Sequence, residues 1–314
     1  MNQKPQVLAF FLLTMVFSWA CWIPFAAARA GLLSVPIPAE VVWLGEFGPS
    51  LIALGLTGFL GGPQALQGLL RKLVTWRVPA RCYLFALGLT PVLVLVSLGI
   101  DGLLFGTTYD PHQLAGWDQR FVERTSAFEP SLGLISGLVY FMRESPWATG
   151  LCLVLLAVTN GGLSEEVGWR GYALPSLHER GHSPLRASLL VGGMWAVWHT
   201  AAPVWQVLLT APLGEGLGFA ALVVLQYLLL LLPLSVLYTV LMRGTGGSVL
   251  LAVLLHASYN LTITLVASAW PEFPMVTLLV LLWLLALVLT VRLRLWRAEA
   301  SLTASDGHLN TPIV

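Results

Sequence analysis

Eight long apolar runs constrain this chain more than any other feature of its sequence. A helix needs about 20 mostly apolar residues to cross the hydrocarbon core of a bilayer, and each run is close to that length or longer. The runs are Val7–Ala28, Val41–Leu60, Tyr83–Gly106, Pro146–Gly168, Pro184–Ala202, Leu217–Met242, Ser248–Ser268 and Phe273–Leu293. Only 10% of the 314 residues are charged, whereas an ordinary soluble domain has about 25%. The sequence therefore predicts an all-α polytopic membrane protein with about eight transmembrane helices.

The composition also excludes several classes of protein. With 57% hydrophobic residues the chain has ample apolar surface to bury, so intrinsic disorder is excluded. The 16 Lys and Arg residues nearly balance 15 Asp and Glu residues, which leaves no basic surplus for nucleic acid. Three cysteines without a CxxC spacing predict neither a disulfide framework nor a thiolate metal site. We expect membrane lipids as partners and no nucleic acid.

The distribution of Lys and Arg between the predicted helices indicates the orientation of the chain. With eight helices both termini lie on one side, and most of the Lys and Arg residues of the connecting segments fall on that side. Because cytoplasmic loops are enriched in these residues, we expect both termini to be cytoplasmic, in a multi-pass protein of the cytoplasmic (plasma) membrane. We expect residues 1–300 to form a single transmembrane domain and residues 301–314 to form a disordered cytoplasmic tail.

Two adjacent glutamates stand at the end of the fourth run. A charged side chain in hydrocarbon costs at least about 2.5–3.5 kcal/mol. Glu166 and Arg170 are four residues apart, so on a helix they share a face and we expect them to pair. Neighbouring residues point about 100° apart, so Glu165 is turned elsewhere, without a local partner, and is suited to act as a general base. Alternatively, both carboxylates reach the headgroup region and are solvated there.

Histidines and an asparagine occur inside two later runs. His199 lies in the fifth run, and His256 and Asn260 lie in the seventh, four residues apart and so on one face of a helix. A single intramembrane His is often a hydrogen-bonded core residue, but three runs that supply Glu, His and His with Asn favour a shared polar site. Glu46, by contrast, adjoins a Gly-Pro pair, and we predict a structural role there, at a kink or a close helix contact.

The order of these polar residues resembles the pattern of the CPBP family, which comprises type II CAAX-processing prenyl endopeptidases and bacteriocin-processing or immunity proteins. Three motifs carry the resemblance, one on each of three predicted membrane helices. They are Glu165-Glu166-x-x-x-Arg170, Trp195-x-x-x-His199 and His256-x-x-x-Asn260. They fall within a family-like core of about residues 146–268. This chain has Trp195 where the family usually has Phe.

The resemblance implies an intramembrane endopeptidase with an eight-helix core. Glu165 takes the place of the family's catalytic Glu, and Glu166 and Arg170 take the place of its supporting pair. His199, His256 and Asn260 take the remaining polar positions of the site. The implied substrate is a peptide or protein, either lipidated, as the family name suggests, or held at the membrane in another way.

Two mechanisms remain open for this set of residues. In the first, Glu165 and His199 activate a water molecule, and His256 and Asn260 stabilise the oxyanion without a cofactor. In the second, His199, His256 and Glu165 bind Zn²⁺, which activates the water. Depths along the predicted helices place the site in a cavity below the cytoplasmic surface, open to water from that side.

Two other classes of function also remain open. A non-catalytic membrane scaffold or bacteriocin-immunity protein would keep the fold without needing Glu165. A proton-coupled transporter would also place Glu and His within the membrane. A transporter predicts internal symmetry between two halves, however, and the sequence shows no internal repeat.

Overall fold

The structure is a computed structural model, and it describes residues 6–35, 37–38, 40–110, 112, 146–270 and 273–297. Within these ranges the chain is built from helices joined by short connections, and it contains no strand. The predicted tail at 301–314 lies outside the described residues. The all-α architecture is confirmed.

The helices follow one another along the chain as a series of long spans and shorter segments. Their order is α1 (Val7–Arg29), α2 (Glu40–Glu46), α3 (Gly48–Leu73), α4 (Ala80–Phe105), α7 (Pro146–Ala157), η2 (Val158–Leu163), α8 (Ser164–Glu166), η3 (Val167–Ala173), α9 (Leu174–Glu179), α10 (Pro184–His199), α11 (Ala201–Thr210), α12 (Leu213–Gly244), α13 (Val249–Ala269) and α14 (Met275–Arg292). The two η segments are π-helical.

Six helices in the described ranges are long and apolar enough to cross a membrane, and α2 with α3 makes a seventh if this pair, bent by 52°, counts as one span. The protein is thus a multi-pass integral membrane protein. The fifth predicted run corresponds to α10, which has only 16 residues, or about 24 Å at 1.5 Å per residue, and is followed by the separate helix α11. The count of eight spans and the cytoplasmic termini stay predictions.

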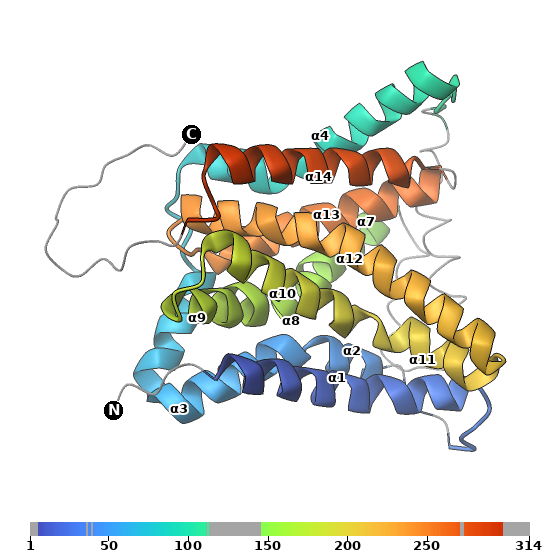
Figure 1. Cartoon of the computed structure of the whole chain (residues 1–314), viewed down its shortest axis with the longest axis horizontal. Coiled ribbons are helices and arrows are strands. Elements are labelled where there is room, and N and C mark those ends of the chain that lie inside the picture. The colour runs from blue at the N-terminus through green and yellow to red at the C-terminus, as the bar shows by residue number, and fades with distance from the viewer. Residues whose placement is uncertain are drawn as a thin grey trace, which may run out of the picture.

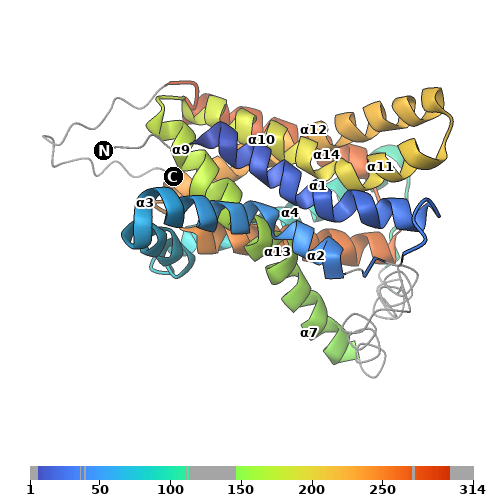
Figure 2. The same ribbon diagram turned by 90° about the horizontal axis from the view of Figure 1, so that it is seen from below.

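The helices lie side by side in one bundle. The start of α1 and the end of α14 lie at the same end of it (Figure 1). In the view from below, α7 leans away from the bundle, whereas the segments that follow it return to the centre (Figure 2). The main packing partners are α10 with α12, α13 with α4, and α3 with η3. The segments that carry the predicted polar residues therefore lie inside the bundle.

Small residues allow the closest of these helix contacts. A Cβ atom at Gly192 of α10 would lie 2.9 Å from the Cβ of Ser235 on α12, and one at Gly168 of η3 would lie 2.5 Å from the backbone oxygen of Pro49 on α3. Small side chains are common where membrane helices approach closely. A hydrogen bond from the Ser235 hydroxyl to the carbonyl of Ser188, 2.8 Å long, adds to the first contact.

The fourth predicted run ends too early in the chain. The sequence predicted a helix that stops at Gly168, but the span continues from Trp147 to Glu179. Arg170, which lies beyond the predicted end of the run, is 0% exposed within this span. The physical reason is that Arg170 lies against the carboxylate of Glu166, so the pair carries little net charge and the helix continues through the protein interior.

Candidate active site

The six polar residues predicted from the sequence gather at one place in the bundle. Glu165 and Glu166 lie on α8, Arg170 on η3, His199 at the end of α10, and His256 and Asn260 on α13. Three of them, Glu165, Glu166 and Arg170, are at most 2% exposed, and His256 is 5% exposed. The side chain of His199 is 25% exposed and Asn260 is half-buried, so the cluster is open at these two residues.

Glu166 lies between Arg170 and His256 and contacts both side chains. Its Oε2 lies 3.3 Å from the Nε of Arg170, and its Oε1 lies 2.7 Å from the Nδ1 of His256. The guanidinium of Arg170 is also held between two aromatic rings, 4.6 Å from the ring centroid of Trp195 and 4.1 Å from that of Tyr238. The predicted contact between Glu166 and Arg170 is present. Glu166 also holds the ring of His256.

Glu165 has partners that the sequence reading missed. Its Oε2 accepts hydrogen bonds from the indole Nε1 of Trp195, at 2.5 Å, and of Trp169, at 3.2 Å. The expectation that Glu165 lacks a local partner is therefore wrong, because Trp169 stands four residues later on the same helical segment. This i, i+4 spacing was a signal that the sequence offered. The other oxygen, Oε1, lies 3.9 Å from the Nε2 of His199.

The hydrogen bonds of the two histidines fix which ring nitrogen carries a proton. The Nδ1 of His199 lies 3.0 Å from the backbone carbonyl of Trp195, and the Nδ1 of His256 faces the carboxylate of Glu166. Carbonyl and carboxylate oxygens only accept, so each Nδ1 donates its proton. A neutral ring then presents the lone pair of Nε2. In His199 this lone pair is on the Nε2 that lies near the Oε1 of Glu165.

A break in the helix adjoins this cluster. Asn160 has φ −93° and ψ 111°, and Gly161 has φ 94° and ψ −59°. A Cβ atom at Gly161 would lie 2.6 Å from the Nε2 of His256 and 2.7 Å from the Nδ2 of Asn260, so glycine is required both by its φ and by space. The Nδ2 of Asn260 donates to the carbonyl of Asn160 at 3.3 Å. His256 and Asn260 thus meet one piece of unwound backbone.

Glu46 lies closer to this cluster than its predicted structural role implies. The predicted kink is present, because α2 and α3 meet at 52° beside this residue. The predicted close contact is present too, since Gly48 packs against the side chain of Ser18 on α1. Helix α2, which ends at Glu46, nevertheless contacts η2, the segment that adjoins this cluster. The site therefore has a third carboxylate in its surroundings.

The zinc ligands suggested by the sequence do not form a metal site in this structure. Across the described residues, no group of three His, Cys, Asp or Glu side chains is placed to hold a metal ion. The Oε2 of Glu165 is engaged by two indole donors.

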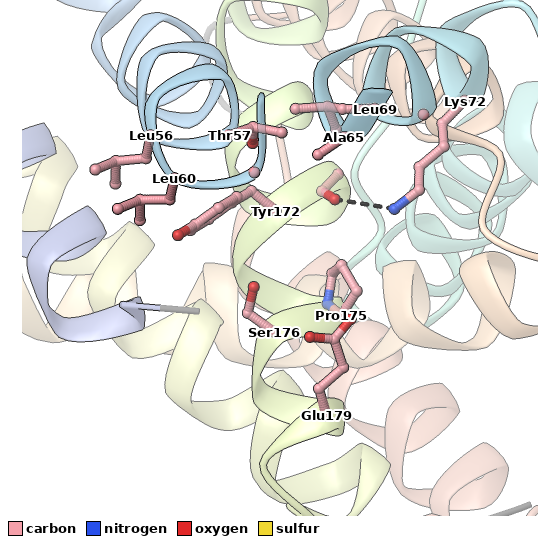
Figure 3. Close-up of a pocket in the computed structure, with 13 residues that line it drawn as sticks. Leu56, Thr57, Leu60, Ala65, Leu69, Lys72, Tyr172, Pro175, Ser176 and Glu179 are labelled. Carbon is pink, nitrogen blue, oxygen red and sulfur yellow. Dashed lines mark hydrogen bonds between the residues drawn. The ribbon is translucent and has the colours of Figure 1, made fainter. Parts of the chain in front are cut away.

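A separate cavity of about 600 Å³ lies between α3 and the η3–α9 segment (Figure 3). Leucines line one part of it, and Lys72 and Glu179 line another. Lys72 donates from its Nζ to the carbonyl of Gly171 at 3.2 Å, which ties α3 to η3. None of the six predicted polar residues lines this cavity, so it is not the cavity expected around Glu165.

Comparison with known proteins relates the region of this site to one family. Residues 146–262 match the family described as type II CAAX prenyl endopeptidase Rce1-like. The CAAX prenyl protease 2 of Methanococcus maripaludis is 34% identical over 124 residues, which make up 37% of this chain and 40% of that protein. The chain thus matches less than half the length of this curated relative. The matched region holds all six polar residues, and the resemblance stated from the sequence is confirmed.

Proposed function

Because residues 146–262 of this chain match the Rce1-like family of type II CAAX prenyl endopeptidases and resemble a CAAX prenyl protease 2, we propose that the protein is an intramembrane endopeptidase. Its substrate is a peptide or protein that is held at the membrane, by a lipid or by its own apolar segment. The reaction is hydrolysis of a peptide bond, with Glu165 and His199 as the groups that activate water.

One contact supports this proposal more than any other. The Oε1 of Glu165 and the Nε2 of His199 are 3.9 Å apart, and both atoms are hydrogen-bond acceptors when the ring is neutral. A water molecule about 2.8 Å from each acceptor fits between two atoms at that separation. It would direct one O–H group to each of them, which leaves a lone pair of its oxygen free to attack a carbonyl carbon.

The proton transfers then follow from the two acceptors. Glu165 takes one proton from the water through Oε1 while the water oxygen bonds to the carbonyl carbon of the substrate. His199 accepts the hydrogen bond of the second O–H group and so keeps the water oriented. Glu165 next gives its proton to the nitrogen of the scissile bond. The carbon–nitrogen bond breaks, and an amine and a carboxylic acid leave.

His256 and Asn260 are suited to stabilise the negative oxygen that forms on the carbonyl. The amide nitrogen of Asn260 has two protons, and the carbonyl of Asn160 accepts one of them, so the second is available. His256 donates from Nε2 only when its ring is doubly protonated, and the carboxylate of Glu166, 2.7 Å from Nδ1, offsets that charge. Arg170 holds Glu166 in place for this task.

Replacing the proposed base tests the function directly. We expect Glu165→Gln to abolish cleavage but to leave the protein folded, because the amide oxygen of Gln still accepts a hydrogen bond from an indole. The measurement compares cells that express wild type or variant at equal levels, and it profiles new protein N-termini and C-termini by mass spectrometry. Cleavage products that occur only with the wild type would also identify the substrate.

The control makes the same chemical change at an exposed site. Glu215 lies in the first turn of α12 and is exposed, so Glu215→Gln should keep all cleavage products. Products that persist in folded Glu165→Gln would contradict the assigned base. If cells that express the wild type and cells that lack the protein give the same terminal profiles, the scaffold or immunity function is favoured instead.

A further inference from the structure

Trp195 contacts more members of the site than any of the proposed catalytic residues does. Its indole N–H donates to the Oε2 of Glu165, and its ring lies under the guanidinium of Arg170. Its ring centroid is 5.7 Å from that of His199 and 5.6 Å from that of His256. Trp195 is 2% exposed, so water does not compete for its N–H group.

A second indole reaches the same carboxylate oxygen from another segment. Trp169 is 0% exposed and donates from Nε1 to the Oε2 of Glu165 at 3.2 Å. It comes from η3, whereas Trp195 comes from α10. Hydrogen bonds to an ionised acceptor are roughly twice as strong as bonds between neutral groups. Two such donors from different segments restrict both the position and the rotation of the carboxylate.

The two indoles therefore distinguish the two oxygens of Glu165. With Oε2 bound to both indoles, Oε1 is the oxygen that faces His199. We propose that Trp195 and Trp169 are positioning residues, whose indole N–H groups hold Glu165 by Oε2 so that Oε1 is directed at the water shared with His199. This inference rests on the proposed function of Glu165. In the sequence Trp195 counted as an aromatic equivalent of Phe, but a phenyl ring has no N–H group to donate.

Removing the donor while keeping an aromatic ring tests the proposal. With the purified protein and the substrate peptide that the terminal profiles identify, we expect Trp195→Phe to lower kcat by about 10- to 100-fold, the range that a small misplacement of a reacting group produces. KM should change by less than about twofold, because the buried indole presents almost no surface to a substrate. Trp169→Phe should lower kcat less than Trp195→Phe, since its hydrogen bond is longer.

Trp198 supplies a matched control on the same helix. It is also fully buried, and its indole N–H donates to the hydroxyl of Ser18 at 2.8 Å rather than to Glu165. Its ring also packs against His199, 4.7 Å between centroids, as the ring of Trp195 does. Trp198→Phe thus removes the same atoms, a neighbour of His199 and one buried hydrogen bond, but no donor to Glu165. If Trp195 only fills space, the two variants will lose kcat and melting temperature alike. A kcat for Trp195→Phe within about threefold of that for Trp198→Phe overturns the proposal.

A spectroscopic measurement separates the contact from the enzymatic activity. The 13 tryptophans give 13 indole N–H signals in nitrogen-15 spectra of the detergent-solubilised protein, and the Trp195 signal is the one missing in Trp195→Phe. We expect Glu165→Gln to move this signal upfield and to leave that of Trp198 in place, because a neutral amide attracts the indole proton less than a carboxylate does.

The two readouts fail in different ways. If the Trp195 signal does not respond to Glu165→Gln, the indoles do not hold Glu165 and the positioning proposal is wrong, whatever the activity. If the signal responds but Trp195→Phe and Trp198→Phe cleave equally well, the contact exists without positioning the base, and the proposal is again wrong. If the signal responds and wild type cleaves no peptide, the proposed function of Glu165 fails with the contact intact.

Discussion

The span Trp147–Glu179 and helix α12 are nearly equal in length, at 33 and 32 residues, but they differ in the regularity of their backbones. The first contains a break at Asn160 and Gly161 and two π-helical segments, and it carries buried charges. Helix α12 is α-helical throughout. Its two charged residues lie in its first and last turns, at Glu215 and Arg243.

This difference indicates two roles within one bundle. A regular helix supports its neighbours, and an interrupted span carries the proposed reactive groups. In α12, the polar groups at the contact with α10 bind neighbouring helices, as the hydroxyls of Ser235 and Thr239 do with Ser188. In the interrupted span, unwound backbone and buried carboxylates face two histidines. π-helical turns often occur at functional sites.

The largest effect on stability is expected from Arg170→Ala in the interrupted span. The change leaves the buried carboxylate of Glu166 without its cation, and breaking a buried ion pair in this way costs about 3–5 kcal/mol. We expect a large drop in the thermal unfolding midpoint in detergent, measured by light scattering or fluorescence. Arg292→Ala, at an exposed position in the last turn of α14, should cost less than about 0.5 kcal/mol. Equal midpoints for the two variants would contradict a paired interior charge.

A smaller effect is expected where the backbone of the interrupted span is unwound. Gly161→Ala places a side chain on a residue with φ 94° and drives a Cβ atom against His256 and Asn260. Backbone strain of this kind costs about 1–3 kcal/mol, and the displaced His256 should also reduce cleavage. In α12, Gly218→Ala meets nothing within 4 Å and should stabilise the helix by about 0.5–1 kcal/mol. Opposite signs of the two midpoint shifts are the expected result.

The smallest effect is expected at the contact between α10 and α12. A Cβ atom at Gly192 would lie 2.9 Å from the Cβ of Ser235, whereas one at the next residue, Gly193, would meet nothing within 4 Å. Overpacking costs about 1–3 kcal/mol, and we expect the lower part of this range for Gly192→Ala, since the change adds a single methyl group at a residue without a positive φ. Gly193→Ala serves as the control. If both variants unfold at the wild-type midpoint, the close approach of the two helices is not tight.

Much of the site could be predicted because its members stand in membrane runs where polar residues are costly. Glu165, His199 and His256 each stood out for that reason. The contact between Glu166 and Arg170 followed from the spacing of four residues. The continuation of the span beyond Gly168 could not be predicted from the cost of polar residues. Arg170 follows the predicted end of the run, and only the structure shows that it is buried against Glu166.

The partners of Glu165 illustrate a second limit. Trp169 could have been recognised from its spacing, but Trp195 stands 30 residues away in the chain and belongs to another helix. No periodicity in the sequence relates an indole N–H group on α10 to one oxygen of a carboxylate on α8. The break at Gly161 was equally hidden, because a pair of glycines in an apolar run fits a regular helix as well as an unwound one.

The sequence by itself determined that this chain is a helical membrane protein, and it determined which polar side chains the membrane segments carry. Both follow from local physics, since hydrocarbon tolerates helices and penalises charge wherever they occur along a chain. The tertiary structure decided which of those side chains meet, which oxygen of Glu165 faces His199 and where the helix unwinds. These depend on the distances between separate helices, and such distances are fixed only when the whole bundle packs.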